Sequence, residues 1–474
     1  MPEPARIAID LGAESCRVSL LRWQGTRPSI EVVHRIPNGP VHRADGLHWP
    51  IESILSGLDE GIRKAASLAL EGVASIAVDC WSVDYVRLGP DGNRLHEPFC
   101  YRDERTVASK EKADRLIAPR DLYARTGTHP QRINTAYQLM ADESAGIETI
   151  APWIMLPEFV LYWLSGQRVA EYTNASHTGL VSLKTHDWDD EVLGLLGLSI
   201  SAAPRIVHAG TVLGPLRGPL AELSALKNTH IIAPATHDTA SAIAGIGSDL
   251  DSSAYISSGT WSLVGTLTND PCTTDRAFHV GYTNIGAATG ELLFHALVNS
   301  MWVLKQCMNA WDHEGRKWEI EDLVLRAADC NRVPDAVLDM DAATLMLDSA
   351  MPGRINSELA RLGFESIPDV AGNEPMFARL IFESLAARYA TAIANLNETL
   401  GRELKRIHMI GGATRNKLLI RLTEQRTGLP VDVGECESAT IGNFAIQLAA
   451  SDAGGARLTA AAIREQAERL CGLI

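Results

Sequence analysis

The stretch IIAPATHDTASAIAGIGSDLDSSAYISSGTWSLVG, residues 231–265, decides the fold class of this chain. It opens on an apolar run, and small apolar residues then recur at helical spacing over 240–246, which predicts a strand followed by a buried helix. Residues 254–257 and 261–267 indicate two further strands joined by a short turn. This order of elements is typical of an α/β protein.

Asp238 lies at the junction between the predicted strand and the predicted helix, and two interpretations of its role stay open. As a helix cap it would accept backbone hydrogen bonds. As a general base it would act on an alcohol beside the turn at Ser258 and Gly259, whose amides and hydroxyls can bind phosphate. The two roles are compatible, since a helix terminus keeps a carboxylate ionised. Taken alone, His237 fits a structural histidine and residues 258–260 fit an ordinary hairpin turn.

Length and charge restrict the function classes. At 474 residues the chain exceeds one typical core, so we expect two domains. The formal charge of −15 argues against nucleic acid or an anionic membrane as the main partner, because both require a basic surface. A protein of this charge that handles phosphates must hold them with backbone amides, a metal ion and a few local cations.

The cysteines and apolar segments bear on the compartment. Eight cysteines are scattered without a Cys-x-x-Cys pair, which favours reduced thiols over a disulfide framework or a zinc site. The start MPEPARIAIDLG lacks the features of a signal peptide, and the apolar stretch 153–164 is too short to cross a bilayer. We therefore expect a soluble cytoplasmic protein with no membrane partner, and the sequence predicts no particular oligomeric state.

Another hairpin is predicted at residues 5–23, with its turn at Gly12. Asp10 closes its first strand and could hold a metal ion through water, while Gly12 allows the backbone to approach a phosphate. The same pattern occurs in many ordinary hairpins. Its likeness to residues 254–267 nevertheless predicts two related half-domains that face one nucleotide, with a boundary near residues 245–251.

A strand predicted at 73–78 ends just before Trp81, Ser82 and Asp84. Ligands bind at such strand ends in α/β folds, although Trp81 fits core packing about as well as a sugar platform. The charged residues of 101–105 favour mutual ion pairs over a contact with substrate hydroxyls.

Longer segments complete the predicted order. They are a helix at 51–69, a mostly helical lid-like insertion at 106–200 with a helix at 153–164, a loop at 209–219, a loop up to Asn284, and a helix from about 291 to 311 that carries Asn299 and Gln306. Residues 406–434 predict a strand, a Gly411-Gly412 turn, a helix and a strand, so helix amides would face a ligand in the turn; simple packing is the alternative. Residues 437–450 predict a helix of small residues packed against a strand.

Several common catalytic motifs are absent from the sequence. It contains no Gly-x-x-x-x-Gly-Lys-Ser/Thr loop, no His-Arg-Asp or Asp-Phe-Gly pair, no Gly-x-Gly-x-x-Gly opening a βαβ unit and no Gly-x-Ser-x-Gly elbow. P-loop enzymes, protein kinases, dinucleotide dehydrogenases and serine hydrolases are therefore poorly supported.

The ordered motifs of the chain resemble those of the FGGY carbohydrate kinases, most closely the rhamnulokinases. They are IAIDLGAESCR, VDCWSVDYV, YRDERT, NTAYQL, EYTNA, THDTASA, SSGTWSL and IGGATRN, and they extend from about residue 5 to residue 450. The resemblance implies two actin-like, ribonuclease-H-like domains, 1–247 and 248–474, with MgATP and a sugar in the cleft between them. The first would hold the sugar, the base and one phosphate hairpin, and the second would hold the nucleotide.

The resemblance also implies roles for single residues. Asp238 would take the proton from the 1-hydroxyl of a deoxyketose such as L-rhamnulose, and Asp10 would bind Mg²⁺ through water. The positions that match sugar-lining residues are Ser82, His237, Thr239 and Asn299. The positions that match nucleotide-binding residues are Ala13, Glu14, Ser15, Cys16, Arg17, Gly259, Thr260, Gln306, Gly412, Ala413 and Asn416.

Some positions depart from the pattern of the rhamnulokinases. Cys16 and Ser82 stand where glycine is usual, Ala413 stands where glycine is common, and Glu14 places a negative charge in a phosphate turn. The residue after Asn299 that faces the nucleotide could be Lys305, Gln306 or Cys307. The alternatives are thus a kinase for another ketose or polyol, such as L-fuculose, L-xylulose or glycerol, and a non-catalytic protein that binds nucleotide or sugar.

Overall fold

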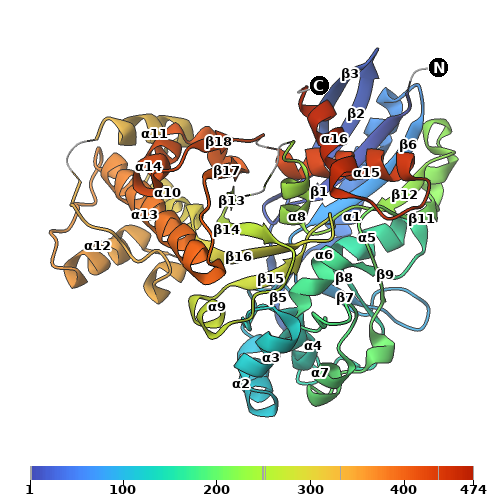
Figure 1. The fold of residues 1–474 in the computed structure, drawn as a ribbon, viewed down its shortest axis with the longest axis horizontal. Coiled ribbons are helices and arrows are strands. Elements are labelled where there is room, and N and C mark those ends of the chain that lie inside the picture. The colour runs from blue at the N-terminus through green and yellow to red at the C-terminus, as the bar shows by residue number, and fades with distance from the viewer. Residues whose placement is uncertain are drawn as a thin grey trace.

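Two six-stranded sheets organise the computed structural model, which describes residues 3–247, 250, 252–330, 333–347, 349–435 and 437–472 (Figure 1). The first sheet has the order β11 (Thr211–Pro215), β12 (His230–Ala233), β6 (Val73–Cys80), β1 (Ala5–Leu11), β2 (Ser15–Gln24), β3 (Arg27–Pro37). The second has the order β15 (Thr283–Gly286), β16 (Leu292–Asn299), β14 (Trp261–Thr268), β13 (Ser253–Ser258), β17 (Arg406–Ile410), β18 (Val431–Val433). We call each sheet with its covering helices a lobe, the first and the second.

Both lobes repeat one arrangement of strands. In the first, β1 pairs antiparallel with β2 and parallel with β6. In the second, β13 pairs antiparallel with β14 and parallel with β17. The predicted hairpins at 5–23 and 254–267 are therefore equivalent elements of two related units. The α/β class, with a mixed sheet in each of two domains, is confirmed.

Helices cover the sheets, so the central strands are buried on both faces. Every residue of β1 is buried, including Arg6 and Asp10, as expected for a strand that lies between two helical layers. In the first lobe, α1 (Ile51–Leu68) packs on β2 and β3, and α5 (Leu156–Ser165) packs on β6 and β12. In the second lobe, the long helix α13 (Glu374–Leu400) packs on β14 and α14 (Lys417–Thr427) packs beside it.

Two helices join the lobes. α8 (Asp238–Ala244) packs against α15 (Ser438–Ala453), and α15 crosses back to β1 and β6 of the first sheet, as Figure 1 shows in red, with α16 (Ala460–Cys471) beside it. The helix backbones approach so closely that a Cβ atom on Gly442 would lie 1.7 Å from the carbonyl oxygen of Ser241. The small residues of this segment are thus explained, and its predicted packing against a strand is confirmed.

The remaining elements are insertions between the repeated ones. Those of the first half are β4 (Val41–Arg43), β5 (Gly46–His48), β7 (Tyr85–Arg87), α2 (Thr106–Leu116), α3 (Pro119–Thr126), α4 (Thr135–Ala141), β8 (Trp153–Met155), β9 (Val169–Glu171), α6 (Tyr172–Ala175), α7 (Asp190–Leu195) and β10 (Arg205–Val207). Those of the second are α9 (Asp275–Val280), α10 (Met301–His313), α11 (Ile320–Ala328) and α12 (Met351–Arg361).

Some predicted elements were wrong. Residues 292–299 form strand β16 instead of the start of a helix, so Asn299 ends a strand and α10 begins at Met301. A short buried apolar run looks the same in a strand and in a helix, which explains the error. The predicted helix at 153–164 begins with the short strand β8, the loop at 209–219 contains β11, and the loop up to Asn284 contains α9 and the start of β15.

The seven cysteines within the described residues are free thiols, and Cys436 lies outside those residues. In the same part of the chain, every helix is either too short or too polar to cross a membrane.

We expect Gly442→Ala to weaken the junction of the lobes. The new methyl group would collide with backbone atoms of α8, which cannot turn aside, so the free energy of unfolding should fall by about 3 kcal/mol or more. Urea unfolding measures this change. The matched control is Gly353→Ala on α12, where a Cβ meets open space and the helix should be unchanged or stabilised by up to about 1 kcal/mol. Equal stability of the two variants would contradict the described contact.

Candidate active site

Three carboxylates gather where the first sheet meets α8. Asp10 and Asp79 are direct neighbours near the ends of the parallel strands β1 and β6, and Asp238 is the first residue of α8. Asp10 and Asp79 are buried, whereas the side chain of Asp238 is 39% exposed. Burial raises the pKa of Asp79, and the neighbouring charge of Asp10 raises it further. The site thus combines one accessible acid with two enclosed ones.

Asp238 is well suited to accept a proton. Burial of its surroundings raises its pKa to about 7, the charge of Asp10 adds to the rise, and hydrogen bonds from Thr239 oppose it. The amide and hydroxyl of Thr239 both donate to Oδ1 of Asp238. The N-cap position itself is His237, so capping does not account for Asp238. A reachable carboxylate with a raised pKa in this position is a candidate general base.

A pair of buried glutamates holds the segment before the base, and the sequence analysis assigned no role to either. Glu158 Oε1 accepts hydrogen bonds from the Thr236 hydroxyl at 2.6 Å and from the Glu171 amide at 3.0 Å. Glu171 Oε2 accepts one from the Thr236 amide at 3.0 Å. Burial raises the pKa of each glutamate to about 7. The EYTNA motif contained part of this signal, because Thr173 binds Glu171 and Asn174 binds Glu158.

The two hairpin turns meet across the lobes. Glu14, in the turn between β1 and β2, accepts a hydrogen bond from the Thr260 hydroxyl at 3.2 Å. Lys305 of α10 forms an ion pair with the same carboxylate oxygen at 2.6 Å. The Trp302 amide donates to the Thr260 carbonyl at 3.0 Å, which fixes the second turn to α10. Of the three alternatives after Asn299, Lys305 reaches the opposite hairpin, and it neutralises the charge of Glu14.

The turn between β1 and β2 is tight, and the cysteine that follows it lies in the core of the first lobe. A Cβ on Gly12 would lie 2.5 Å from the Ser15 carbonyl, so only glycine fits there. Cys16 is buried in the core of the first lobe, and burial raises its thiol pKa to about 12. Ala13 and Ser15 are half-buried in the turn, and Arg17 binds Asp10 at 2.6 Å. The Cys16 side chain therefore belongs to the core and does not project from the turn.

The predicted nucleotide turn lies beside the second hairpin. Gly411 has φ +83° and approaches the Ser258 carbonyl so closely that a Cβ would lie 2.7 Å from it. Gly412 is exposed, whereas Ala413 is buried in the core of the second lobe. Asn416 caps α14 by accepting the Leu419 amide at 3.0 Å, and its buried Nδ2 has no hydrogen-bond partner among the residues that the structure describes. Gly259, Thr260 and residues 411–416 are thus brought together; Gln306 lies buried on α10.

The four residues predicted to line the sugar lie in two places, three of them in the first lobe and Asn299 in the second lobe. Ser82 follows β6 and adjoins Val83, whose φ of +72° is unusual for a β-branched residue and marks local strain. His237 and Thr239 flank Asp238. The amide group of Asn299 instead donates to the carbonyls of Met340 and Leu345, each at 3.1 Å, so it faces the second lobe. Its role toward a sugar stays a prediction.

Trp81 belongs to the core. It is 8% exposed, its ring lies 4.3 Å from that of Trp49, and both indoles donate to Asp84 Oδ2. Burial raises the pKa of Asp84 to about 7. Trp81 had two interpretations, core packing and a sugar platform, and these contacts support core packing.

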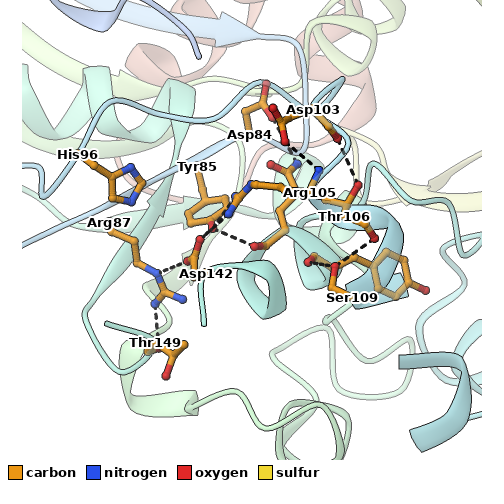
Figure 2. A network of polar contacts seen from close by, with 12 residues as sticks. Asp84, Tyr85, Arg87, His96, Asp103, Arg105, Thr106, Ser109, Asp142 and Thr149 are labelled. Atoms are coloured by element: carbon orange, nitrogen blue, oxygen red, sulfur yellow. Dashed lines mark hydrogen bonds and ion pairs between the residues drawn. The ribbon is translucent and has the colours of Figure 1, made fainter. Parts of the chain in front are cut away.

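The predicted ion pairs within residues 101–105 were wrong. Arg105 instead forms an ion pair with Asp142, as Figure 2 shows. The carboxylate of Asp142 accepts from the guanidinium groups of Arg105 and Arg87, each at 2.8 Å, and from the Tyr85 hydroxyl at 2.6 Å. Asp142 is fully buried and lies far along the chain, so local spacing did not reveal it. This network joins β7 to the segment that follows α4 within the first-half insertion.

Comparison of the sequence with known proteins gives matches along most of the chain. A family model described as the FGGY family of carbohydrate kinases, N-terminal domain, matches residues 5–245, and the corresponding C-terminal domain model matches residues 254–451. A rhamnulokinase from Bacteroides thetaiotaomicron is 32% identical over 443 residues, which cover 93% of this chain and 89% of that protein.

Solved structures share the fold. A gluconate kinase from Lactobacillus acidophilus has a TM-score of 0.73 at 17% identity, covering 99% of this chain and 97% of that one. A Plasmodium falciparum glycerol kinase with ADP also has a TM-score of 0.73, at 13% identity, covering 98% and 92%. At such low identity this likeness establishes the architecture alone.

The glutamate pair predicts a pH dependence of stability. Because burial raises the pKa of Glu158 from 4.5 to about 7, the folded protein retains a proton there that the unfolded chain has lost. The free energy of unfolding should therefore fall as pH rises from about 4.5 to about 7, and Glu158→Gln should remove part of this slope. Gln fits because Asn174 can turn its unpartnered Oδ1 toward the new amide.

Urea unfolding at several pH values between 5 and 8 checks this expectation. The exposed Glu148→Gln is the control and should keep the wild-type slope. Parallel profiles for wild type and Glu158→Gln would show that Glu158 does not hold a proton in the folded state.

Proposed function

The chain belongs to the FGGY family of carbohydrate kinases, and we propose that it transfers the γ-phosphoryl group of ATP to the 1-hydroxyl of a deoxyketose, with L-rhamnulose as the first candidate. Members of this family are ATP-dependent phosphotransferases that act on sugars. The observation that carries the proposal is the position of the accessible acid Asp238 beside two hairpins that meet at Glu14 and Thr260. The choice of L-rhamnulose is supported by the motifs and by the rhamnulokinase relative.

Asp238 would act as the general base. As the sugar oxygen bonds to the γ-phosphorus, the hydroxyl proton passes to the carboxylate, and the bond from phosphorus to the bridging oxygen breaks to release ADP. The carboxylate must be ionised to accept that proton. Because its pKa is raised toward 7, activity should decline as pH falls below neutrality. Closure of the lobes would exclude water and align the hydroxyl.

The turns would hold the phosphates. The turn between β1 and β2 and the turn at Thr260 would approach the phosphates from the two lobes, since they meet at the contact between Glu14 and Thr260. The Gly259 amide already donates to the Trp261 carbonyl at 2.9 Å, and Gly411 of the predicted nucleotide turn adjoins Ser258 of the second hairpin. Lys305 would keep its ion pair with Glu14 beside the phosphates. The positive charge of Lys305 would then offset the repulsion that Glu14 alone would impose on a polyphosphate.

Magnesium fits the acids of the first sheet. Within the described part of the chain, Asp79 Oδ1 is buried without a hydrogen-bond partner, and its neighbour Asp10 supplies a second carboxylate. Among the described residues, no three His, Cys, Asp or Glu side chains form a ready metal cage. One or two carboxylates with water and phosphate are the usual ligands of Mg²⁺ in phosphoryl transfer. When bound, the ion would neutralise charge that develops on the phosphate oxygens.

The division into domains 1–247 and 248–474 is part of the proposal. The family models end at residue 245 and begin at 254, and the two sheets lie on either side of that interval. Because α15 returns to the first sheet, any closure of the lobes would have to turn about the contact between α8 and α15.

Asp238→Asn tests the base. Asn can still accept the Thr239 amide, so the fold should be kept, while kcat should fall by about 10²-fold to 10⁴-fold because no group takes the proton. Coupled detection of ADP measures the rate. The exposed Asp121→Asn is the control and should keep wild-type activity. Wild-type turnover in Asp238→Asn would remove this residue from the mechanism.

A substrate panel tests the sugar. We expect the highest kcat/KM with L-rhamnulose among L-rhamnulose, L-fuculose, L-xylulose and glycerol. A higher value for another member would assign that substrate instead. Tight binding of ATP without any sugar-stimulated release of ADP would identify a non-catalytic binding protein.

A further inference from the structure

A chain of histidines leads away from the base. His237 lies between Asp238 and His177, with its Nε2 3.4 Å from Asp238 Oδ1 and its Nδ1 3.2 Å from Nε2 of His177. The rings of His177 and His237 have centroids 4.1 Å apart in an edge-to-face arrangement. His177 comes from the short 3₁₀ helix Ser176–Thr178 of the first-half insertion, far from α8 in sequence.

The second lobe continues this chain. His295 of β16 stacks on His177 with centroids 6.2 Å apart, and its Nδ1 lies 2.8 Å from the Tyr255 hydroxyl of β13. His177 therefore packs between His237 of the first lobe and His295 of the second.

Burial favours the neutral form of these three imidazoles. Burial lowers the pKa of His237 and of His295 to about 3, and it also lowers the pKa of His177, where the two neighbouring rings add to the effect. A neutral imidazole has one N–H donor and one acceptor nitrogen. Each of the three histidine rings therefore adopts one of two tautomers, and the hydrogen-bonding groups beside the ring determine which one.

The neighbours of His237 select its tautomer. When Asp238 is ionised, the form that can act as a base, its carboxylate only accepts hydrogen bonds. Because Nε2 of His237 lies 3.4 Å from Asp238 Oδ1, this charge favours the tautomer that carries the proton on Nε2. Nδ1 of His237 is then the acceptor, and Nε2 of His177 must be the donor across the 3.2 Å contact. Without a donor at that point, His237 could take the opposite tautomer and present a lone pair to the base.

We propose that His177 is a positioning residue of the phosphoryl transfer, whose Nε2–H holds His237 in the tautomer and orientation that direct its own Nε2–H toward Asp238 and the sugar hydroxyl. The inference rests on the proposed function, in which Asp238 is the base. His177 itself touches neither the base nor the reacting atoms. Loss of its donor should lower kcat by about tenfold or more, as is typical when a partner that orients an active-site histidine is removed.

Three substitutions of His177 test whether its Nε2–H is needed. His177→Phe keeps a ring without an N–H, His177→Leu is a smaller variant that also lacks a donor, and His177→Gln returns an amide N–H near the place of Nε2. We expect Phe and Leu to lower kcat at least tenfold with KM for ATP within twofold of wild type, and Gln to restore most of the rate. The control His42→Phe, at an exposed position of β4, should change neither quantity.

A spectroscopic measurement reads the tautomer directly. Long-range ¹H–¹⁵N spectra of protein with ¹⁵N-labelled histidine, with the His237 signals assigned by their loss in His237→Asn, should show Nε2–H in wild type and in His177→Gln. The donor-free variant that folds, as judged by urea unfolding, should shift His237 toward the Nδ1–H form.

The outcomes separate the two proposals. A wild-type enzyme without kinase activity overturns the proposed function, and with it the assigned role of His177. Kinase activity that survives unchanged in His177→Phe or His177→Leu overturns the inference alone. An Nδ1–H tautomer of His237 in wild type, or an unchanged tautomer in the donor-free variants, overturns it as well.

Discussion

The contact between α8 and α15 is the constraint on which the rest of the structure depends. α8 begins with Asp238, and α15 follows the last strand of the second sheet, so their contact relates the base to the second lobe. Further along α15, Asn443 donates to Asp79 at 2.6 Å and Gln447 donates to the Ile7 carbonyl at 3.1 Å. One helix thus touches the strands that carry two of the three clustered acids.

Electrostatics makes this arrangement costly, and local partners offset the cost. Buried carboxylates disfavour their ionised form, and Asp10, Asp79 and Asp238 also repel one another. Arg17 binds Asp10, Lys305 binds Glu14, and Asn443 binds Asp79. In a chain with a formal charge of −15, Lys305 thus places a positive charge at the point where the two turns meet.

Local signals predicted part of the fold well. The hairpins at Gly12 and Ser258, and the turn at Gly411, were visible because alternating strands and glycine corners are properties of neighbouring residues. The segment 292–299 was mistaken for a helix because its apolar run lacks a period, and its pairing with β14, remote along the chain, decides that it is a strand. The prediction of ion pairs within residues 101–105 was wrong for a similar reason, since the partner of Arg105 is the distant residue Asp142.

The sequence by itself determined the two repeated hairpins, the acid at the start of α8 and the motifs that indicate the family. These depend on residues close together along the chain or on patterns of residue type. Only the tertiary structure decided that Lys305 neutralises Glu14, that Glu158 and Glu171 hold the segment before the base, and that His177 contacts His237. Each of these contacts joins residues more than 50 positions apart or from different lobes, and such proximity follows from packing of the whole chain, which spacing does not encode.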